Sequence, residues 1–167
     1  MLTVRSMESA DLPVVWTMAL LPNVGATADL SVPVPLSPAS VAPLEFSDLA
    51  DPAGTFTAVD GDFVVAELEG HVVGMGGFQP SSMPGRAEVL RVRVHPARRR
   101  MGIGRAVMAA LESRAAARGF REAWLDTSTN QPEAMAFYES LGYGQVGRES
   151  RSEWHWTLVY YLKRLPH

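Results

Sequence analysis

Two glycines and a run of arginines lie between residues 98 and 105, where a strand would give way to a helix. The β-branched residues before Pro96 favour a strand, and the apolar spacing over 103–118 favours a helix. Gly102 and Gly104 are therefore expected at a helix N-terminus, where unpaired backbone N–H groups and the helix dipole attract anions. Neither glycine has a Cβ to obstruct a phosphate oxygen, and the neighbouring guanidinium groups suit phosphate geometry. This segment is predicted to bind a phosphate group.

Two common phosphate-binding motifs do not fit this segment. A dinucleotide-binding turn needs Gly-x-Gly-x-x-Gly or Ala directly after the strand, but Val107 stands at the third position and the arginines intervene. A mononucleotide P-loop needs Gly-x-x-x-x-Gly-Lys-Ser/Thr, and that string does not occur in the chain. Neither a dinucleotide-dependent oxidoreductase nor a P-loop nucleotidase is favoured.

The string Arg99-x-x-Gly102-x-Gly104 resembles the signature of the GCN5-related N-acetyltransferases (GNAT), whose loop holds the pyrophosphate of acetyl-coenzyme A. Residues 87–94 are similar to the fourth strand of that family, with Glu88 where many members carry a catalytic carboxylate. Residues 123–127 indicate the buried strand that follows, and 131–143 resemble the last helix with its Tyr-Glu-x-Leu-Gly-aromatic ending. These resemblances cover the second half of the chain, and the first half matches more loosely.

The elements that must position these residues form a β, α, loop, β, β, β, α, β, α, β, β order. We expect strands at 2–5, 62–68, 71–78, 87–94, 123–127, 143–148 and 155–162, and helices from Ser9 to Leu20, over 103–118 and over 131–143. That order indicates an α/β fold with a mixed sheet and helices on both faces. The resemblance implies one GNAT domain over 1–167, whose two central parallel strands splay apart to admit the pantetheine arm.

The resemblance also implies which residues hold acetyl-CoA. The strand backbone would pair with the pantetheine arm, and the loop and helix start would hold the pyrophosphate. These residues are Val92, Arg93, Val94, Arg98, Arg99, Arg100, Met101, Gly102, Ile103, Gly104 and Arg105. Many members have an asparagine seven residues before the tyrosine; Gln131 stands there in this chain and Asn130 precedes it, so either amide is a candidate contact.

Tyr138 is the candidate general acid. By spacing alone it shares a helical face with Ala134, Phe137 and Leu141, which is typical of a core tyrosine. The family match instead implies a proton donor for the departing thiolate, which a phenol with a pKa near 10 can serve at neutral pH. Contact with the coenzyme alone is the other interpretation.

Glu88 is the candidate base. It alternates in phase with Leu90, Val92 and Val94, so the pattern places a carboxylate on an otherwise apolar face, with Arg91 and Arg93 on the opposite side. Such a carboxylate is either functional, with a pKa raised by burial, or structural. It acts either as a base, through water, on the acceptor amine, or in a purely structural or substrate-orienting role.

The composition of the chain argues against several classes of protein. The formal net charge of −3 offers no general field for nucleic acid, and the absence of cysteine excludes disulfides, thiol nucleophiles and thiolate metal sites. The four histidines show no metal-ligand spacing, so we expect no metal. The N-terminal residues show neither a signal-peptide core nor a membrane-length apolar run, so we expect a cytoplasmic protein without membrane contact.

The acceptor-binding parts are the least specified by sequence. Residues 22–55 are rich in proline, serine and alanine and are predicted to be mostly loop, with room for a short helix near 41–49; they form either an acceptor-site wall or a variable surface loop. Residues 153–156 either line the acceptor pocket or pack on the sheet. The predicted activity is acetyl transfer from acetyl-CoA to a primary amine of a small molecule, or of a peptide or protein. A non-catalytic acyl-CoA-binding module is the alternative, and homodimerisation is a family expectation.

Overall fold

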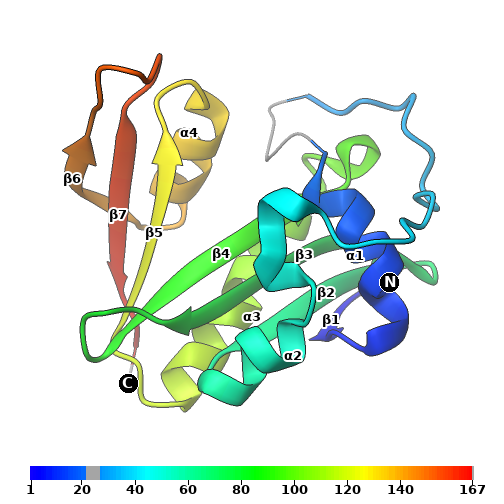
Figure 1. The fold of residues 1–167 in the computed structure, drawn as a ribbon, viewed down its shortest axis with the longest axis horizontal. Coiled ribbons are helices and arrows are strands. Elements are labelled where there is room, and N and C mark those ends of the chain that lie inside the picture. The colour runs from blue at the N-terminus through cyan, green and yellow to red at the C-terminus, as the bar shows by residue number, and fades with distance from the viewer. Residues whose placement is uncertain (22–26, 167) are drawn as a thin grey trace.

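The computed structural model describes residues 1–21 and 27–166 and contains a mixed α/β arrangement, as the element order predicted (Figure 1). The strands are β1 (Leu2–Ser6), β2 (Asp62–Leu68), β3 (His71–Pro80), β4 (Arg86–Val94), β5 (Glu122–Ser128), β6 (Gly144–Glu149) and β7 (Leu158–Arg164). The α-helices are α1 (Leu12–Ala19), α2 (Pro52–Thr55), α3 (Ile103–Ala117) and α4 (Pro132–Ser140). Short 3-10 turns lie at η1 (Ser9–Asp11), η2 (Leu44–Leu49), η3 (Thr57–Val59) and η4 (Pro96–Arg98).

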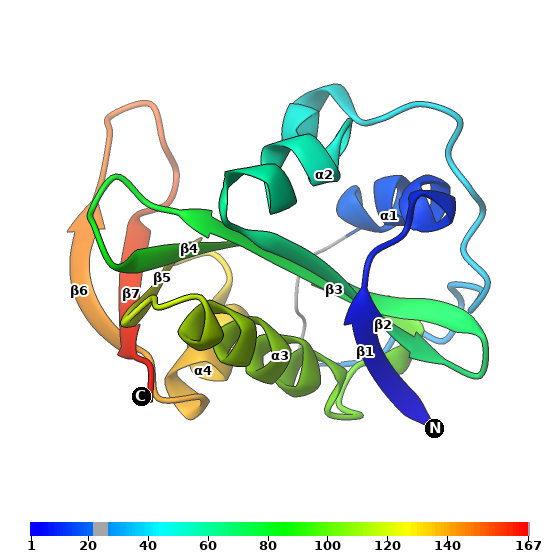
Figure 2. The ribbon, with the colours of Figure 1, turned by 90° about the horizontal axis from the view of Figure 1, so that it is seen from below.

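One seven-stranded sheet runs in the order β1-β2-β3-β4-β5-β7-β6. Its neighbours are antiparallel except β4 and β5, which run parallel. Helices α1 and α2 cover one face of the sheet and α3 and α4 the other, so the expected helices on both faces are confirmed (Figure 2). Among the helices described, none is long and apolar enough to cross a membrane.

Helix α3 packs closely on the sheet. Val107, Met108 and Leu111 on this helix are fully buried in the larger core cluster. A Cβ on Gly74 of β3 would lie 2.7 Å from Cγ2 of Ile103, closer than non-bonded carbons can approach. The glycine at this position of β3 therefore permits the close approach of helix α3.

The two parallel strands separate soon after they pair. Their register contains Arg86 with Glu122, Ala87 with Ala123 and Glu88 with Trp124, and no pairs beyond these. From that point β5 leans away from β4 toward β7 (Figure 1). The splay that the family resemblance implied is therefore present, and it begins at Glu88.

Strand β4 contains a β-bulge that the alternation pattern did not predict. Arg91 has a φ of +58°, and the register with β3 shifts between Met75 and Gly77. An extra residue reverses the alternation of side chains beyond it. Val92 and Val94 consequently join the core beneath α3. Leu90 packs against a second core, which is formed by Val15, Met18, Ala19, Leu36, Leu49, Phe56, Phe63, Val65 and Met75.

The expectation that Glu88 shares a face with Val92 and Val94 was therefore wrong. Glu88 shares its face with Leu90 and, beyond the bulge, with Arg93. The expectation that Arg93 projects to the side opposite Glu88 was wrong for the same reason, and its guanidinium lies 5.6 Å from the ring centroid of Phe46 beside the second core.

Smaller differences lie at element ends. Glu8 is the N-cap of the 3-10 turn η1, and the carboxylate of Asp11 accepts a hydrogen bond from the Glu8 N–H at 2.8 Å. Leu20 is exposed. The last strand begins at Leu158 rather than at 155. Within the expected loop 22–55, residues 22–26 lie outside the described residues, and 44–49 form the 3-10 turn η2.

Candidate active site

A cavity of about 490 Å³ opens at the N-terminus of α3. Its lining residues are Val94, Arg99, Arg100, Gly102, Ile103, Gly104, Arg105, Glu133, Ala136 and Phe137. The first hydrogen bond of the helix runs from the Ala106 N–H to the Gly102 carbonyl at 3.0 Å, so the preceding N–H groups lack helical partners. We call this space the donor cavity.

The two glycines of the loop have different roles. Gly102 has a φ of +81° and no atom within 4 Å of a built Cβ, so it provides both the left-handed turn and clear space before the helix. Gly104 was expected to clear space for a phosphate, but its built Cβ would lie 3.0 Å from Cζ of Phe137. Gly104 lines the donor cavity and also permits α4, which carries Tyr138, to approach α3 closely, while its contact with a phosphate stays a prediction.

The arginine run divides between the donor cavity and its surroundings. Arg99 and Arg100 line the cavity together with Arg105 from the first helical turn, whereas Arg98 and Met101 line neither this cavity nor the cleft beside it. Arg98 donates from Nη1 to the Ala97 carbonyl at 3.3 Å. The positive lining therefore comes from two of the three consecutive arginines and from the helix start.

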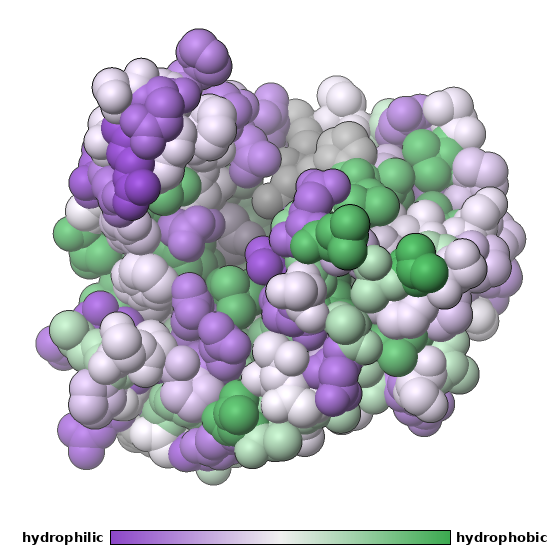
Figure 3. All heavy atoms as spheres, in the orientation of Figure 1, coloured by the Kyte–Doolittle hydropathy of each residue, from purple (hydrophilic) through white to green (hydrophobic). Residues whose placement is uncertain are grey.

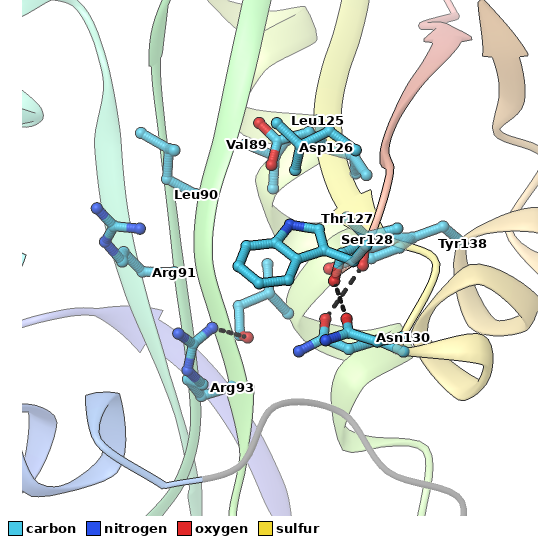
Figure 4. A pocket seen from close by; sticks show the side chains of 14 residues that line it. Val89, Leu90, Arg91, Arg93, Leu125, Asp126, Thr127, Ser128, Asn130 and Tyr138 are labelled. Atoms are coloured by element: carbon cyan, nitrogen blue, oxygen red, sulfur yellow. Dashed lines mark hydrogen bonds between the residues drawn. The ribbon is translucent and has the colours of Figure 1, made fainter. Parts of the chain in front are cut away.

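A second space, a cleft of about 380 Å³, lies where β4 and β5 diverge. We call it the central cleft. Its walls include Val89 to Arg93 of β4, Leu125 to Ser128 of β5, and Asn130, Gln131, Tyr138, Trp156 and Leu158 (Figure 4). The surface is hollowed between the half that carries β5 to β7 and the half that carries α1, with hydrophilic side chains along the rim (Figure 3). Val92 lines the cleft and Val94 lines the donor cavity, so β4 connects the two spaces.

Tyr138 lies in the wall of the central cleft, as the candidate acid should. Its side chain is 5% exposed and is surrounded by the rings of Phe137, Tyr143 and Tyr161, with centroids 5.1, 6.0 and 6.5 Å away. Burial raises the pKa of Tyr138 to about 12, although the nearby Arg93 cation lowers it. The hydroxyl is therefore protonated at neutral pH and able to donate.

Glu88 is the last residue of β4 that pairs with β5 and is not among the residues that line the central cleft; its carboxylate accepts a hydrogen bond from Nε2 of Gln79 at 3.2 Å. Asp126, on the opposite wall, is a functional candidate that the sequence analysis missed. Burial and the negative charge of Glu88 raise the pKa of Asp126, and Arg91 opposes this. A signal was present in the sequence, because an aspartate follows directly on the apolar residues 123–125 within a predicted buried strand.

Both candidate amides line the central cleft. The Thr127 hydroxyl donates to Oε1 of Gln131 at 3.2 Å, and the Ser128 hydroxyl donates to Oδ1 of Asn130. Hydroxyls at the end of β5 thus fix both amide oxygens. The amide nitrogens of both residues are left to donate toward a ligand.

Of the aromatic residues at 153–156, Trp156 lines the cleft, and Trp154 stacks on it at 5.9 Å. Trp156 is the member of 153–156 that lines the cleft, and a role of this segment beside the acceptor stays a prediction. In the part of the chain that the structure describes, no group of three or more His, Asp or Glu side chains is arranged to hold a metal ion.

Comparisons with known proteins agree with this architecture. The model of the acetyltransferase (GNAT) family matches residues 33–143. N-acetyltransferase 8 from Homo sapiens is 34% identical over 129 residues, which cover 72% of this chain and 57% of the relative. The chain thus spans little more than half the length of that relative.

Two solved structures share the fold. A GNAT-family acetyltransferase from Staphylococcus aureus superposes with a TM-score of 0.77 at 14% identity, covering 99% of this chain and 100% of that one. A putative acetyltransferase from Salmonella typhimurium, solved with acetyl-CoA, gives a TM-score of 0.71 at 19% identity, covering 99% and 94%. With the glycine turn, the splayed strands and the family match together, the chain belongs to the GNAT family of acetyltransferases.

Proposed function

We propose that this chain, acting as one domain over residues 1–167, transfers an acetyl group from acetyl-CoA to a primary amine. One observation carries the proposal: a buried, protonated Tyr138 hydroxyl lies in a cleft that strand β4 links directly to the donor cavity. A donor bound along β4 would have its anionic end at the helix start and its reactive end beside Tyr138. The Salmonella neighbour with acetyl-CoA has the same fold and supports this choice of donor.

The donor cavity fits the pyrophosphate of the coenzyme. Gly102 leaves open space in front of the unpaired N–H groups of α3, and Arg99, Arg100 and Arg105 supply positive charge around it. Arg98 and Met101 complete the loop without lining the cavity. The backbone of Val92, Arg93 and Val94 faces the gap left by β5 and can pair with the amides of a pantetheine arm. Asn130 and Gln131 would contact the arm from the opposite wall.

The reaction needs three contributions from the protein: polarisation of the thioester carbonyl, a proton for the departing thiolate, and removal of a proton from the amine. The amine nitrogen attacks the thioester carbonyl carbon, the carbon–sulfur bond breaks, and the electron pair leaves with sulfur. A backbone N–H of the bulged part of β4 can polarise the carbonyl oxygen. The Tyr138 hydroxyl donates its proton to the departing thiolate.

The attacking amine must lose a proton, and Glu88 is the proposed acceptor through a water molecule. Glu88 ends the β4–β5 pairing, and its charge is close enough to Asp126 to raise the pKa of that aspartate. The negative charge of Glu88 makes proton binding at Asp126 easier. The acceptor class is a small-molecule primary amine or a peptide or protein amine.

The cytoplasmic location and the homodimer expected from sequence and family are part of the proposal. Sedimentation at micromolar concentration tests the dimer, and a monomeric mass would remove it.

Thermal melting with acetyl-CoA, NADH and ATP tests donor binding. A ligand at a hundredfold its dissociation constant adds about 2.7 kcal/mol to the free energy of unfolding, so acetyl-CoA should raise the Tm visibly. NADH and ATP should not, because neither turn motif is present. An unchanged Tm with acetyl-CoA would remove the donor assignment.

Turnover then separates an enzyme from a binding module. Thiol release is followed over a panel of primary amines in the presence of acetyl-CoA. Release that depends on an amine supports the transferase. Binding of acetyl-CoA with no release across the panel would favour a non-catalytic acyl-CoA module.

A further inference from the structure

We infer that the acceptor amine carries a carboxylate, as amino acids do, and that the guanidinium of Arg93 binds it in the central cleft. This rests on the proposed function, because it names the acceptor class of the same site. The hydrogen bonding of the Arg93 side chain is incomplete within the described part of the chain.

Among the residues that the structure describes, Arg93 has no carboxylate partner. Its Nη1 donates to the carbonyl of Val92 at 3.0 Å, while its Nε is buried and, among the described residues, has no acceptor. No described carboxylate lies within ion-pair distance of it. A buried N–H of a charged group is costly when it is unsatisfied, so the site gains from an incoming anion.

Arg91 on the same wall provides an internal comparison. Its Nε donates to both carboxylate oxygens of Asp48, at 3.3 and 3.1 Å, and its guanidinium lies 4.6 Å from the ring centroid of Phe46. Arg93 lies near the same ring, at 5.6 Å, but receives no such carboxylate. The protein therefore neutralises one of the two arginines and leaves the second for a ligand.

The expected anion belongs to the acceptor rather than to the donor. The phosphates of a bound coenzyme would lie at the donor cavity, which Arg99, Arg100 and Arg105 line and Arg93 does not. The pantetheine arm that would follow β4 is uncharged. An anion beside Arg93 would thus arrive on the molecule that enters the central cleft from outside.

The opposite wall suits the amine end of the same molecule. Arg91 and Arg93 extend from β4 on one side of the cleft, whereas Asp126 lies on the β5 side (Figure 4). The cleft of about 380 Å³ therefore has a cationic and an anionic wall. An amino acid carries both complementary charges, and a guanidinium fork matches its carboxylate in a bidentate manner.

Matched acceptors test the inference. Each standard L-amino acid is offered as the free acid and as its primary amide, with thiol release as the rate and thermal stabilisation of the coenzyme-A-loaded protein as the binding readout. Amidation lowers the pKa of the amine and so favours the amide chemically; preference for the acid can then come only from recognition. We expect at least one acid to bind roughly 10- to 100-fold more tightly than its amide.

Variants assign the preference to Arg93. Arg93→Gln should raise KM for the acid by roughly 10- to 100-fold and leave the amide nearly unaffected, while Arg93→Lys should recover part of the loss. Arg121→Gln removes the same charge from an exposed position outside the cleft and is the matched control. Both Arg93 variants should keep the Tm increase with acetyl-CoA, because only the backbone of residue 93 faces the donor.

The outcomes are separable. If acids and amides are used alike, if neither form binds or reacts, or if Arg93→Gln slows both equally, the inference is wrong. Equal slowing would assign the guanidinium to the reacting thioester instead. The increase in Tm with acetyl-CoA reports independently on the proposed function, which can stand when the acceptor assignment fails.

Discussion

The chemistry proposed at the level of single residues depends on the surroundings of Tyr138. Three aromatic rings hold its own ring in place, and burial raises the pKa of its phenol to about 12. A phenol with that pKa keeps its proton at neutral pH but can still give it to a developing thiolate. The same environment therefore holds the ring in position and keeps the phenol protonated, while making it a weaker acid than a free tyrosine.

Replacing Tyr138 with phenylalanine removes only the hydroxyl. We expect kcat to fall by about 100-fold or more, because general acid catalysis commonly contributes at least that factor. The Tm increase with acetyl-CoA should persist, since the ring and its packing remain. Steady-state kinetics of thiol release and melting curves provide the two measurements.

Tyr160→Phe is the matched control for this variant. The Tyr160 hydroxyl donates to Glu149 at 2.7 Å, and its ring stacks on Trp124 without lining the central cleft. Its loss should leave kcat close to that of the parent protein. A Tyr138→Phe protein with nearly normal kcat would exclude Tyr138 as the acid.

At this scale the sequence predicted some roles and missed others for identifiable reasons. Helical spacing alone placed Tyr138 in the core, which is correct for its ring, and only the family resemblance suggested a role for its hydroxyl. Asp126 was overlooked because a single aspartate in a short apolar run resembles an edge position. Whether the Nε of Arg93 has a hydrogen-bond acceptor depends on residues that are distant in the sequence. No local sequence pattern therefore predicts that, among the described residues, it has none.

At the scale of elements, the splay between β4 and β5 combines one predictable and one unpredictable feature. The extents of both strands follow from their β-branched and apolar residues, and their prediction was accurate to within a residue. The bulge at Arg91 requires a non-glycine residue with a φ of +58°, which tertiary contacts must stabilise. Alternation counted along the sequence therefore assigned the wrong face beyond it.

The turn at Gly102 yields an expectation for the donor cavity. Gly102→Ala places a Cβ at a φ of +81°, which costs about 1–2 kcal/mol of stability, and it projects into the open space before α3. We expect a lower Tm and a smaller Tm increase with acetyl-CoA. Titration of the coenzyme by calorimetry measures the second effect directly.

Gly70→Ala separates the two effects. Gly70 has a φ of +82° and equally open surroundings, but it lies in the turn between β2 and β3. It should lose similar stability while keeping full coenzyme affinity. If both variants bind acetyl-CoA equally well, the turn at Gly102 does not hold the pyrophosphate.

A second expectation at this scale concerns the junction between β1 and η1. The Asp11 carboxylate bonds to both Nη atoms of Arg5, at 2.8 and 2.9 Å, and to the Glu8 N–H at 2.8 Å. Burial alone would raise the pKa of Asp11, but the hydrogen bonds from Arg5 and Glu8 outweigh it and hold the pKa below its usual 3.8. Asp11→Asn should lower the free energy of unfolding by about 1–2 kcal/mol at pH 7.

The pH dependence follows from the sign of that shift. A carboxyl whose pKa is lower in the folded chain stabilises fully above its unfolded pKa, and this contribution is lost as pH falls through the folded pKa. The difference between Asp11→Asn and the parent should therefore shrink as pH falls below about 4. Asp60→Asn at an exposed site is the control. Denaturant melts showing a constant difference at every pH would indicate lost packing rather than lost charge.

At the scale of the whole molecule, two groups of strands meet at a narrow junction. Strands β1 to β4 and β5 to β7 are joined in the sheet by the three β4–β5 pairs, while the larger core cluster passes beneath both groups. Element order and the position of the donor loop were predictable because the motifs are local. The contacts of Arg91 on the wall of the central cleft could not be predicted in this way. Asp48 and Phe46, which contact Arg91, lie more than forty residues earlier in the chain, in the irregular region.

This architecture gives an expected pattern of hydrogen exchange when acetyl-CoA binds. Beyond Glu88, the edge of β4 that faces the cleft has no strand partner in its register, so its amides can open without breaking sheet pairs on that side. A ligand that pairs along β4 should slow exchange in peptides covering 89–94, and its contacts across the cleft should slow 125–131. Mass spectrometry with and without saturating acetyl-CoA measures both segments.

Strand β2, paired on both sides, provides the reference, because the ligand should change its exchange only through the overall gain in stability. Protection confined to 99–105 would show that the coenzyme is held by its phosphates alone and does not enter the splay. Protection of both cleft walls would instead mean that the ligand completes the missing strand contacts and couples the two groups of strands. The donor would then also be a structural link, and the central cleft would be fully formed for the amine only after the donor has bound.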